Sequence, residues 1–153
     1  MFCSALLAAC AHLGEQQLTQ FLDRYESDPA FRASATGTQI WVTETTIWQA
    51  PGGFDNRISC TSIRSLDWFA GRGYRQIPTP QEAARDGLVV TRTRLSEVTA
   101  DVTVGPARSE PAAIYSFYRD GGIWSLTGVE VFSRQYPEGA APPDYRCLAT
   151  ESG

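Results

Sequence analysis

This 153-residue chain contains no motif that is typical of a catalytic site. The single histidine, His12, lies close to the N-terminus, where it cannot easily join a core pocket, so the commonest general base is missing. Cys60 could act as a nucleophile, but it has no histidine to activate it. Phosphate-binding glycine loops and the Gly-x-Ser-x-Gly nucleophile elbow are absent from the sequence. The sequence therefore predicts no catalytic residue, apart from one carboxylate candidate, Glu130.

Cofactor and metal patterns are missing as well. No Cys-x-x-Cys pair occurs, and a single histidine makes a zinc site improbable. The net charge of −4 argues against nucleic acid, which needs a clustered basic face. All 13 basic residues are arginine, whose planar forks suit phosphate or carboxylate, although a GC-rich genome explains the same bias. We expect no cofactor, no metal and no nucleic-acid partner.

A hairpin near the C-terminus is the best candidate for a binding face. Two β-patterned runs, residues 112–119 and 122–133, flank Asp120-Gly121, a dipeptide that favours a two-residue type I′ turn. That turn fixes the pairing, and Phe117 then lies opposite Trp124. One face is predicted to carry these side chains: Tyr115, Phe117, Trp124, Leu126, Glu130 and Phe132.

If this face is concave, Glu130 is a carboxylate in an apolar pocket, and desolvation would raise its pKa. It would then bind a cationic or hydroxylated ligand, or act as an acid, with Tyr115, Phe117 and Trp124 as further ligand-binding residues. In the alternative reading, Glu130 lies near the sheet rim or pairs with an arginine such as Arg92 or Arg94, and the aromatic row is ordinary core.

The preceding segments must form the scaffold that positions this hairpin. Residues 14–25 predict an amphipathic helix whose apolar face carries Leu18, Phe21, Leu22 and Tyr25. Asp28-Pro29 reads as an N-cap and first helical position, so a short helix over 29–35 should follow. Thr79-Pro80-Gln81-Glu82 reads as a capping box that starts a helix ending at Gly87. Strands are expected over 38–48, 88–95 and 98–104, with a strand passing into a short helix over 58–70.

Size and composition indicate one globular domain. Hydrophobic residues make up 42% and charged residues 20% of the chain, which is ordinary for such a domain. We expect a single α+β domain over residues 10–135, preceded by the remnant of a signal peptide over 1–9. The Pro-, Gly- and Ala-rich tail over 136–153 would be loose unless Cys147 ties it down.

The signal peptide is inferred from an apolar run that ends in Leu7-Ala8-Ala9-Cys10, which resembles the lipobox of bacterial lipoproteins. The resemblance implies that Cys10 becomes the acylated N-terminus and anchors the protein to a membrane of the cell envelope. Ala11, in place of aspartate, resembles lipoproteins sorted to the outer membrane, facing the periplasm. A periplasmic or secreted protein is the alternative location. An ordinary apolar helix start over 5–13 is the alternative reading of the run itself.

The run departs from a secretory signal in two ways. No basic residue precedes Cys10, and the apolar stretch is short, at about the lower limit of 7–15 residues. A start codon upstream of Met1 would explain both. No later stretch approaches the ~20 apolar residues that span a bilayer, so any membrane link would be through the lipid.

Export would also decide the state of the cysteines. Processing would remove Cys3 and acylate Cys10, which leaves Cys60 and Cys147 in an oxidising space. We therefore predict a Cys60–Cys147 disulfide. The loop it closes is long, so the bond is worth about 4 kcal/mol in the chain-entropy model. Two buried free thiols in a cytosolic protein are the alternative.

The predicted order of elements resembles the nuclear transport factor 2-like fold, in particular its uncharacterised bacterial branch. The residues that carry the resemblance are the run from Phe21-Leu22 through Asp28 to Phe31 and the aromatic hairpin from Tyr115 to Leu126. The resemblance implies helices packed on a curved antiparallel sheet that forms a cone. A lipocalin-like barrel or another antiparallel α+β domain is the runner-up. Fold alone does not supply function.

Three functions stay open at this point. The first is an envelope-anchored, non-catalytic module that binds a small apolar ligand or an envelope protein. The second is a small isomerase- or dehydratase-like enzyme, with Glu130 or Asp101 as the acid/base and a tyrosine as its partner. The third is an immunity or inhibitor protein. A wide apolar pocket with Glu130 inside would favour the enzyme.

Overall fold

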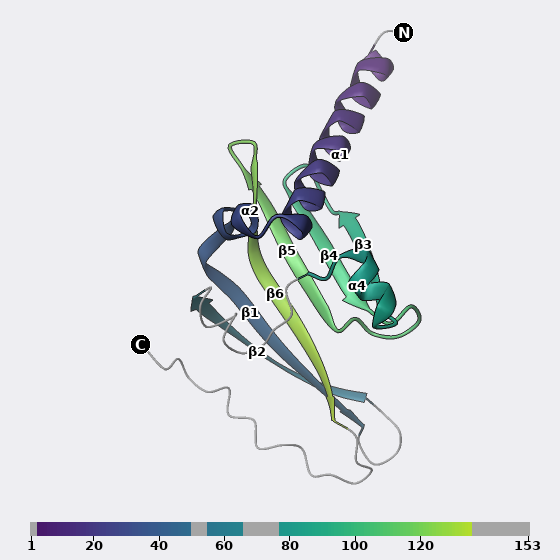
Figure 1. Cartoon of the computed structure of the whole chain (residues 1–153), viewed down its shortest axis with the longest axis vertical. Helices are drawn as coiled ribbons and strands as arrows, with labels where there is room; N and C mark the ends of the chain where they lie inside the picture. Colours follow the sequence, from purple (N-terminus) through teal and green to yellow (C-terminus); the bar gives the residue numbers. More distant parts are fainter. Residues whose placement is uncertain (1–2, 50–54, 66–76, 136–153) are drawn as a thin grey trace.

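The computed structural model describes residues 3–49, 55–65 and 77–135. In this part of the chain, helices lie on one face of a single six-stranded sheet with the order β2-β1-β6-β5-β4-β3 (Figure 1). The helices are α1 (Cys3–Ser27), α2 (Pro29–Ser34) and α4 (Pro80–Arg85). The strands are β1 (Thr36–Gln49), β2 (Asp55–Ser65), β3 (Val89–Arg94), β4 (Thr99–Gly105), β5 (Ala113–Asp120) and β6 (Ile123–Gln135).

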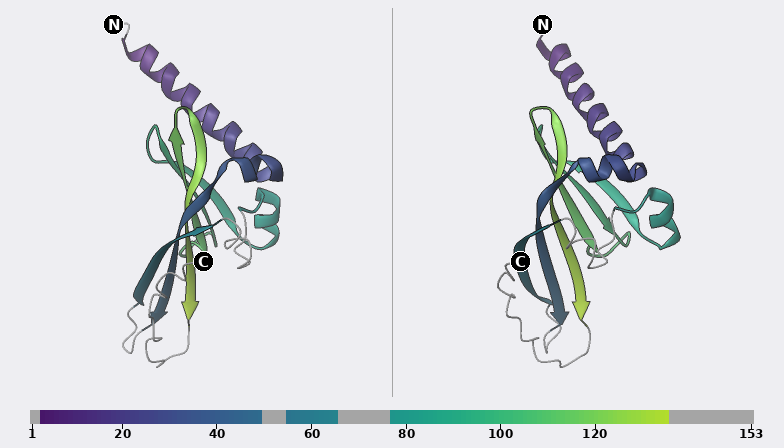
Figure 2. Two further views of the ribbon diagram at one scale, coloured as in Figure 1. Left: turned by 90° about the vertical axis from the view of Figure 1, so that its left-hand side faces the viewer. Right: turned by 60° about the vertical axis from the view of Figure 1, so that its left-hand side comes forward.

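The sheet is curved and open, with β2 and β3 as its edges in the described part of the chain (Figure 2). Neighbouring strands run antiparallel except β1 and β6, which pair in parallel. The predicted α+β class, with N-terminal helices packed on a curved, mainly antiparallel sheet, is therefore confirmed. An open sheet does not fit the runner-up barrel, because a barrel must close on itself.

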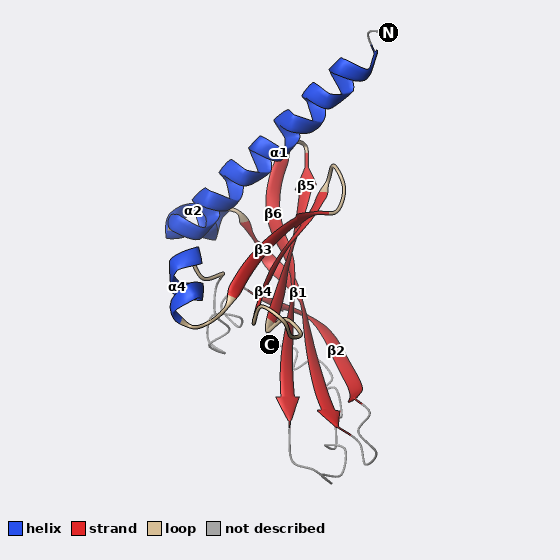
Figure 3. Ribbon diagram, turned by 90° about the vertical axis from the view of Figure 1, so that its right-hand side faces the viewer, coloured by secondary structure: helices blue, strands red, loops and turns tan. Residues whose placement is uncertain are grey.

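Helix α1 follows the predicted amphipathic pattern where it crosses the sheet. Leu18, Leu22 and Tyr25 are buried, and Phe21 is half-buried beside them. The helix is longer than predicted, since it begins at Cys3. Its N-terminal half projects past the end of the sheet, whereas its C-terminal half lies over the strands (Figure 3).

Both short helices begin as their capping residues predict. The Asp28 carboxylate accepts hydrogen bonds from the backbone N–H groups of Ala30 and Phe31, both at 3.0 Å. Thr79 and Glu82 form the reciprocal capping box of α4. The helices end at Ser34 and Arg85, one or two residues before the predicted ends.

The predicted strands are present, with boundaries displaced by a few residues. In β4, Ala100, Val102 and Val104 are buried on the helix side, as their alternation predicts. In the segment 58–70, the strand is observed up to Ser65. The helix predicted to follow it, like the tail over 136–153, lies outside the described residues.

The C-terminal hairpin differs from the prediction at its turn. Asp120 pairs with Ile123, so the turn residues are Gly121 and Gly122, whose φ angles of 53° and 88° suit glycine. Phe117 consequently lies opposite Leu126 and not opposite Trp124. The pairing is offset by an even number of residues, and an even offset leaves every side chain on its predicted face.

A β-bulge then reverses the alternation further along β6. Phe117 pairs with Leu126 but Ser116 pairs with Gly128, so Thr127 is an extra residue on this strand. Beyond the bulge, Val129 is buried in the core on the helix side, and Glu130 points to the opposite face. The prediction that Glu130 and Phe132 share the face of Tyr115 and Trp124 is therefore wrong.

Candidate functional site

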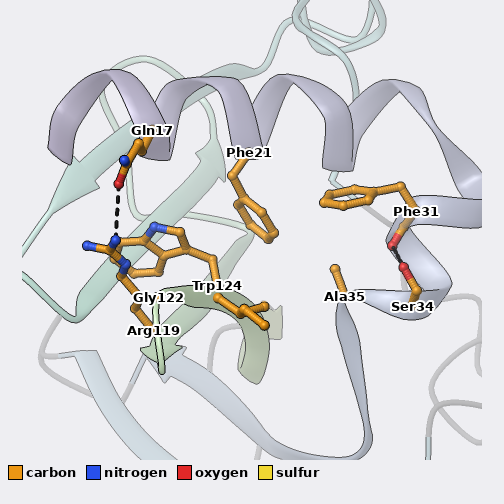
Figure 4. Close-up of a pocket in the computed structure, with 9 residues that line it drawn as sticks. Gln17, Phe21, Phe31, Ser34, Ala35, Arg119, Gly122 and Trp124 are labelled. Atoms are coloured by element: carbon orange, nitrogen blue, oxygen red, sulfur yellow. Dashed lines mark hydrogen bonds between the residues drawn. The ribbon is translucent and has the colours of Figure 1, made fainter. Parts of the chain in front are cut away.

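A hollow lies where α1 and α2 meet the start of β6. Its volume is about 380 Å³. Figure 4 shows Phe21 reaching down from α1 between Trp124 of β6 and Phe31 of α2. The residues that line the hollow are Gln17, Phe21, Phe31, Ser34, Ala35, Arg119, Gly122, Ile123 and Trp124. We call it the hairpin pocket.

Aromatic rings form the inner wall of the hairpin pocket. The ring of Phe21 packs edge-on against Phe31 at a centroid distance of 5.6 Å and against Phe117 at 5.7 Å. The Trp124 side chain is buried, with 4% of the residue exposed. Edge-to-face contacts of this kind hold rings in fixed orientations. The wall is thus a closely packed apolar surface.

Local sequence features place each wall residue. Gln17 and Phe21 lie one helical turn apart, so both project from the same face of α1. The Asp28 cap starts α2 in a position that brings Phe31 against Phe21. Arg119 and Trp124 are direct cross-strand partners next to the Gly121-Gly122 turn. Neighbours of this kind across a hairpin are within side-chain contact distance.

Two nitrogen donors of the pocket lining have no hydrogen-bond partner among the residues that the structure describes. These are Nε of Arg119 and Nε1 of Trp124, both buried. The guanidinium of Arg119 makes one side-chain hydrogen bond, from Nη2 to Oε1 of Gln17 at 3.0 Å. No ion pair within the described part of the chain involves Arg119. A buried donor without an acceptor is unusual in proteins and calls for an explanation.

The predicted ligand-binding residues separate into three environments. Trp124 lines the hairpin pocket. Tyr115 and Phe117 belong to the core, where the ring of Phe117 packs against Tyr25 of α1 at 5.2 Å. Glu130 lies on the far face of the sheet, where Oε1 accepts a hydrogen bond from Thr45 at 2.8 Å. The structure does not bring Glu130 together with the three aromatic residues.

Arg92, suggested above as a partner for Glu130, binds other carboxylates. Its Nε and Nη2 donate to the two oxygens of Glu26 at 3.2 and 2.8 Å, and its Nη1 donates to Asp23 at 2.8 Å. Glu26 is only 5% exposed. This pair joins β3 to α1. Glu26 also lines a second, more polar hollow of about 510 Å³ together with Arg32, Ile77, Pro78, Thr79, Glu82, Arg85 and Asp86.

The buried tyrosines are held in the neutral form. Burial raises the pKa of Tyr25 above its usual value, although the hydrogen bond with Thr36 opposes that shift. Burial, and then the neighbouring Tyr25, raise the pKa of Tyr115 further. Desolvation penalises the phenolate more than the phenol. Both hydroxyls therefore serve as neutral hydrogen-bonding groups at ordinary pH.

Asp101, Cys60 and Cys10 are the remaining candidate residues from the sequence. Asp101 pairs with Ser116 across β4 and β5 on the same far face as Glu130. Cys60 is half-buried on β2, opposite Glu44 of β1, and its predicted partner Cys147 lies outside the described residues, so that disulfide stays a prediction. Cys10 lies in the first half of α1, where the side chains are outside the described ones.

Over residues 3–49, 55–65 and 77–135, no group of three or more His, Cys, Asp or Glu side chains is placed to hold a metal ion. Within those same ranges, no helix has both the length and the apolar character that crossing a bilayer requires.

The whole chain was also compared with known proteins. No protein-family model and no curated protein matches the chain. Among solved structures, the chain is similar to an NTF2-like protein of unknown function from Pseudomonas putida KT2440, with 14% identity and a TM-score of 0.31, covering 81% of this chain and 85% of that chain. A likeness of this size carries no argument about family or activity. The α+β class stands on the sheet order and helix packing described above.

Of the residues that line the hairpin pocket, the sequence-based predictions named only Trp124 as ligand-binding. Among those missed are Gln17, Phe31 and Arg119. Phe31 could have been found, because the Asp28-Pro29 start of α2 places it in the first turn of that helix. Arg119 becomes recognisable only once the hairpin turn is known to be Gly121-Gly122, since that turn makes it the partner of Trp124. Gln17 carries no signal of its own.

Proposed function

We propose that this protein is a non-catalytic module that binds a small ligand with an apolar body in the hairpin pocket. The pocket itself carries the proposal, because it combines a closely packed aromatic wall with two buried, unpartnered donors. Small-molecule sites are typically hollows of about 300–1,000 Å³, mostly apolar and with a few placed polar groups. The hairpin pocket lies at the lower end of that range.

The placement of the acidic groups supports binding over catalysis. Glu130 and Asp101, the carboxylates considered for acid/base chemistry, lie on the face of the sheet away from the pocket. General acid/base catalysis requires a group within hydrogen-bond reach of the reacting atom. Burial raises the pKa of Tyr25 and of Tyr115, so both phenols stay protonated and are not available as general bases.

The pocket can be tested with the neutral dye N-phenyl-1-naphthylamine, whose fluorescence rises on entering an apolar site. Ala35 lines the pocket and is buried, so Ala35→Leu should fill part of the hollow and weaken dye binding severalfold. Ala84→Leu places the same extra volume on the exposed surface of α4 and is the matched control. Equal dye binding by both variants would contradict the proposal.

We further propose that the module is tethered to the bacterial envelope by a lipid on Cys10. A lipid there would be attached to the half of α1 that projects past the sheet (Figures 1 and 3). The location we favour is the periplasmic side of the outer membrane, with an unanchored periplasmic or secreted protein as the alternative.

The tether is tested by membrane fractionation with metabolic labelling by an alkyne-bearing palmitate. Cys10→Ala should abolish the label and release the protein from membranes. Cys3→Ala is the matched control and should leave the label in place. Retention of the label in Cys10→Ala would show that the anchor, if any, lies elsewhere.

Export also predicts the Cys60–Cys147 disulfide. Mass spectrometry of the purified, non-reduced protein should find both cysteines protected from alkylation and joined in one cross-linked peptide. Two alkylatable thiols at these positions would refute the pairing.

A further inference from the structure

We propose that the ligand of the hairpin pocket is a carboxylic acid with a compact apolar body, and that Arg119 and Trp124 receive its carboxylate. This inference rests on the proposed function and adds the chemical class of the ligand. It is argued from the N–H donors of the pocket lining, two of which have no acceptor among the described residues.

On the Nε–Nη2 edge of the Arg119 guanidinium, Nη2 has a hydrogen-bond partner and Nε has none within the described part of the chain. Nε and Nη2 lie on the same edge of the guanidinium, and their two N–H groups point in parallel. Gln17 occupies Nη2 with its single amide oxygen, and Nε is left without an acceptor. A carboxylate has two oxygens in the spacing that fits both N–H groups. An anion of this shape would therefore accept from both nitrogens of this edge once the Gln17 amide moves aside.

The same protein shows what a completed edge looks like. Arg92 places Nε and Nη2 on the two oxygens of Glu26. Arg32 also uses both nitrogens, on the backbone oxygens of Tyr25 and Glu26 at 2.9 and 2.6 Å. Arg119 differs from Arg92 and Arg32 because its Nε is buried and has no acceptor in the described part of the chain. Among the described arginines, Arg119 is the one whose Nε is both buried and without a hydrogen-bond partner.

Trp124 adds a second donor at the same place. Its Nε1 can donate one hydrogen bond and accept none, so it needs an acceptor oxygen. It is the cross-strand partner of Arg119, and its Nε1 is buried without a partner. Leaving a buried donor unpaired costs free energy that a ligand oxygen would recover. Two donors and one positive charge in one lining favour an anionic acceptor over a neutral one.

The rest of the lining selects the apolar body. Phe21, Phe31 and the exposed Ile123 offer only hydrocarbon surface. A hollow of about 380 Å³ suits a body no larger than a small ring system or a short chain. Gln17 is exposed, so its amide can swing away and yield Nη2 to the ligand. Its displacement opens the whole Nε–Nη2 edge.

The inference is tested on the full 153-residue chain by calorimetric titration with benzoate and benzamide. Benzamide has the same planar body but lacks the charge and the second oxygen. Benzoate should bind at least tenfold more tightly than benzamide. Arg119→Lys keeps the charge but removes the parallel donors, and should weaken benzoate binding about tenfold while leaving benzamide unchanged. Arg108→Lys, on an exposed loop, is the matched control and should change neither.

The outcomes separate this inference from the proposal on which it rests. Preference for benzoate, lost in Arg119→Lys alone, supports both. Equal binding of benzoate and benzamide, with dye binding still sensitive to Ala35→Leu, overturns the carboxylate assignment and keeps the pocket. Failure of the dye and of both benzene derivatives to bind overturns the pocket and the inference together. A loss of benzoate binding in Arg108→Lys equal to that in Arg119→Lys would place the anion site elsewhere.

Discussion

Two arginines reach from the sheet to helix α1, and they are used in different ways. Arg92 on β3 donates from all three of its nitrogens to the carboxylates of Asp23 and Glu26. Arg119 on β5 donates from one nitrogen to the neutral amide of Gln17. Glu26 is buried, whereas Gln17 is exposed. The first contact is closed and structural, and the second is incomplete and borders a hollow.

The comparison teaches how a fold with few catalytic groups can still hold a specific site. A filled guanidinium edge holds a helix on a sheet, because removing Arg92 leaves the Glu26 carboxylate buried without this partner. A guanidinium edge with one unpaired nitrogen contributes little to stability, and that nitrogen stays available to a ligand. Mutation should therefore lower the free energy of unfolding much more at the Arg92 site than at the Arg119 site.

The largest stability effect is expected at the closed site. Arg92→Ala leaves the Glu26 carboxylate buried without its partner, so the free energy of unfolding should fall by about 3 kcal/mol. Urea denaturation followed by circular dichroism measures this. The double variant Arg92→Met with Glu26→Met removes both charges and should recover most of the loss. A double variant as unstable as Arg92→Ala would show that packing, and not charge pairing, dominates.

A smaller and pH-dependent effect is expected at Asp28, which starts the helix that carries Phe31. Hydrogen bonds from the backbone N–H of Phe31, and then of Ala30, lower the pKa of this carboxyl group, with the positive charge of Arg24 adding to the shift. Because the pKa of Asp28 is lowered in the folded protein, its carboxylate contributes fully to stability above the usual pKa near 4. This contribution is lost as the pH falls through the lowered pKa.

This prediction is checked by measuring the melting temperature of the wild type and of Asp28 variants from pH 7 to pH 2. Asp28→Ala should melt below the wild type at pH 7, and the difference should shrink as the solution is acidified. Asp28→Asn can still accept the capping bonds but lacks the charge, so it should melt between Asp28→Ala and the wild type at pH 7. A difference between wild type and Asp28→Ala that stays constant with pH would rule out the charged cap.

The smallest stability effect is expected at the open site. Arg119→Met removes one hydrogen bond to an exposed amide and also removes a buried, unpaired N–H, so the free energy of unfolding should change by less than about 1 kcal/mol. The same urea denaturation applies. A loss as large as that of Arg92→Ala would mean that Arg119 is structural, and the contrast between the two sites would collapse.

Local sequence signals predicted much of this fold. The buried face of α1, the caps at Asp28 and Thr79 and the alternation in β4 all depend on neighbours in the chain, and each is observed. The hairpin face was also predicted, since an even offset of register leaves the facing of Tyr115, Phe117 and Trp124 unchanged.

The site was predicted only in part, for a physical reason. The bulge at Thr127 depends on how β6 fits between β1 and β5, and nothing in the residues around it announces an extra residue. That one insertion turned Glu130 away from the pocket. Arg119 and Gln17 are 102 positions apart in the chain, and only the packing of α1 on the hairpin brings them together.

The most direct test is a ¹H–¹⁵N correlation spectrum of the protein during a titration with benzoate. The side-chain N–H signals of Arg119 (Nε) and Trp124 (Nε1), assigned with Arg119→Lys and Trp124→Phe, report the two vacant donors themselves. Both signals should move downfield in proportion to bound benzoate, with the Arg119 signal unmoved by benzamide. Saturation with benzoate that leaves both signals in place would contradict the account.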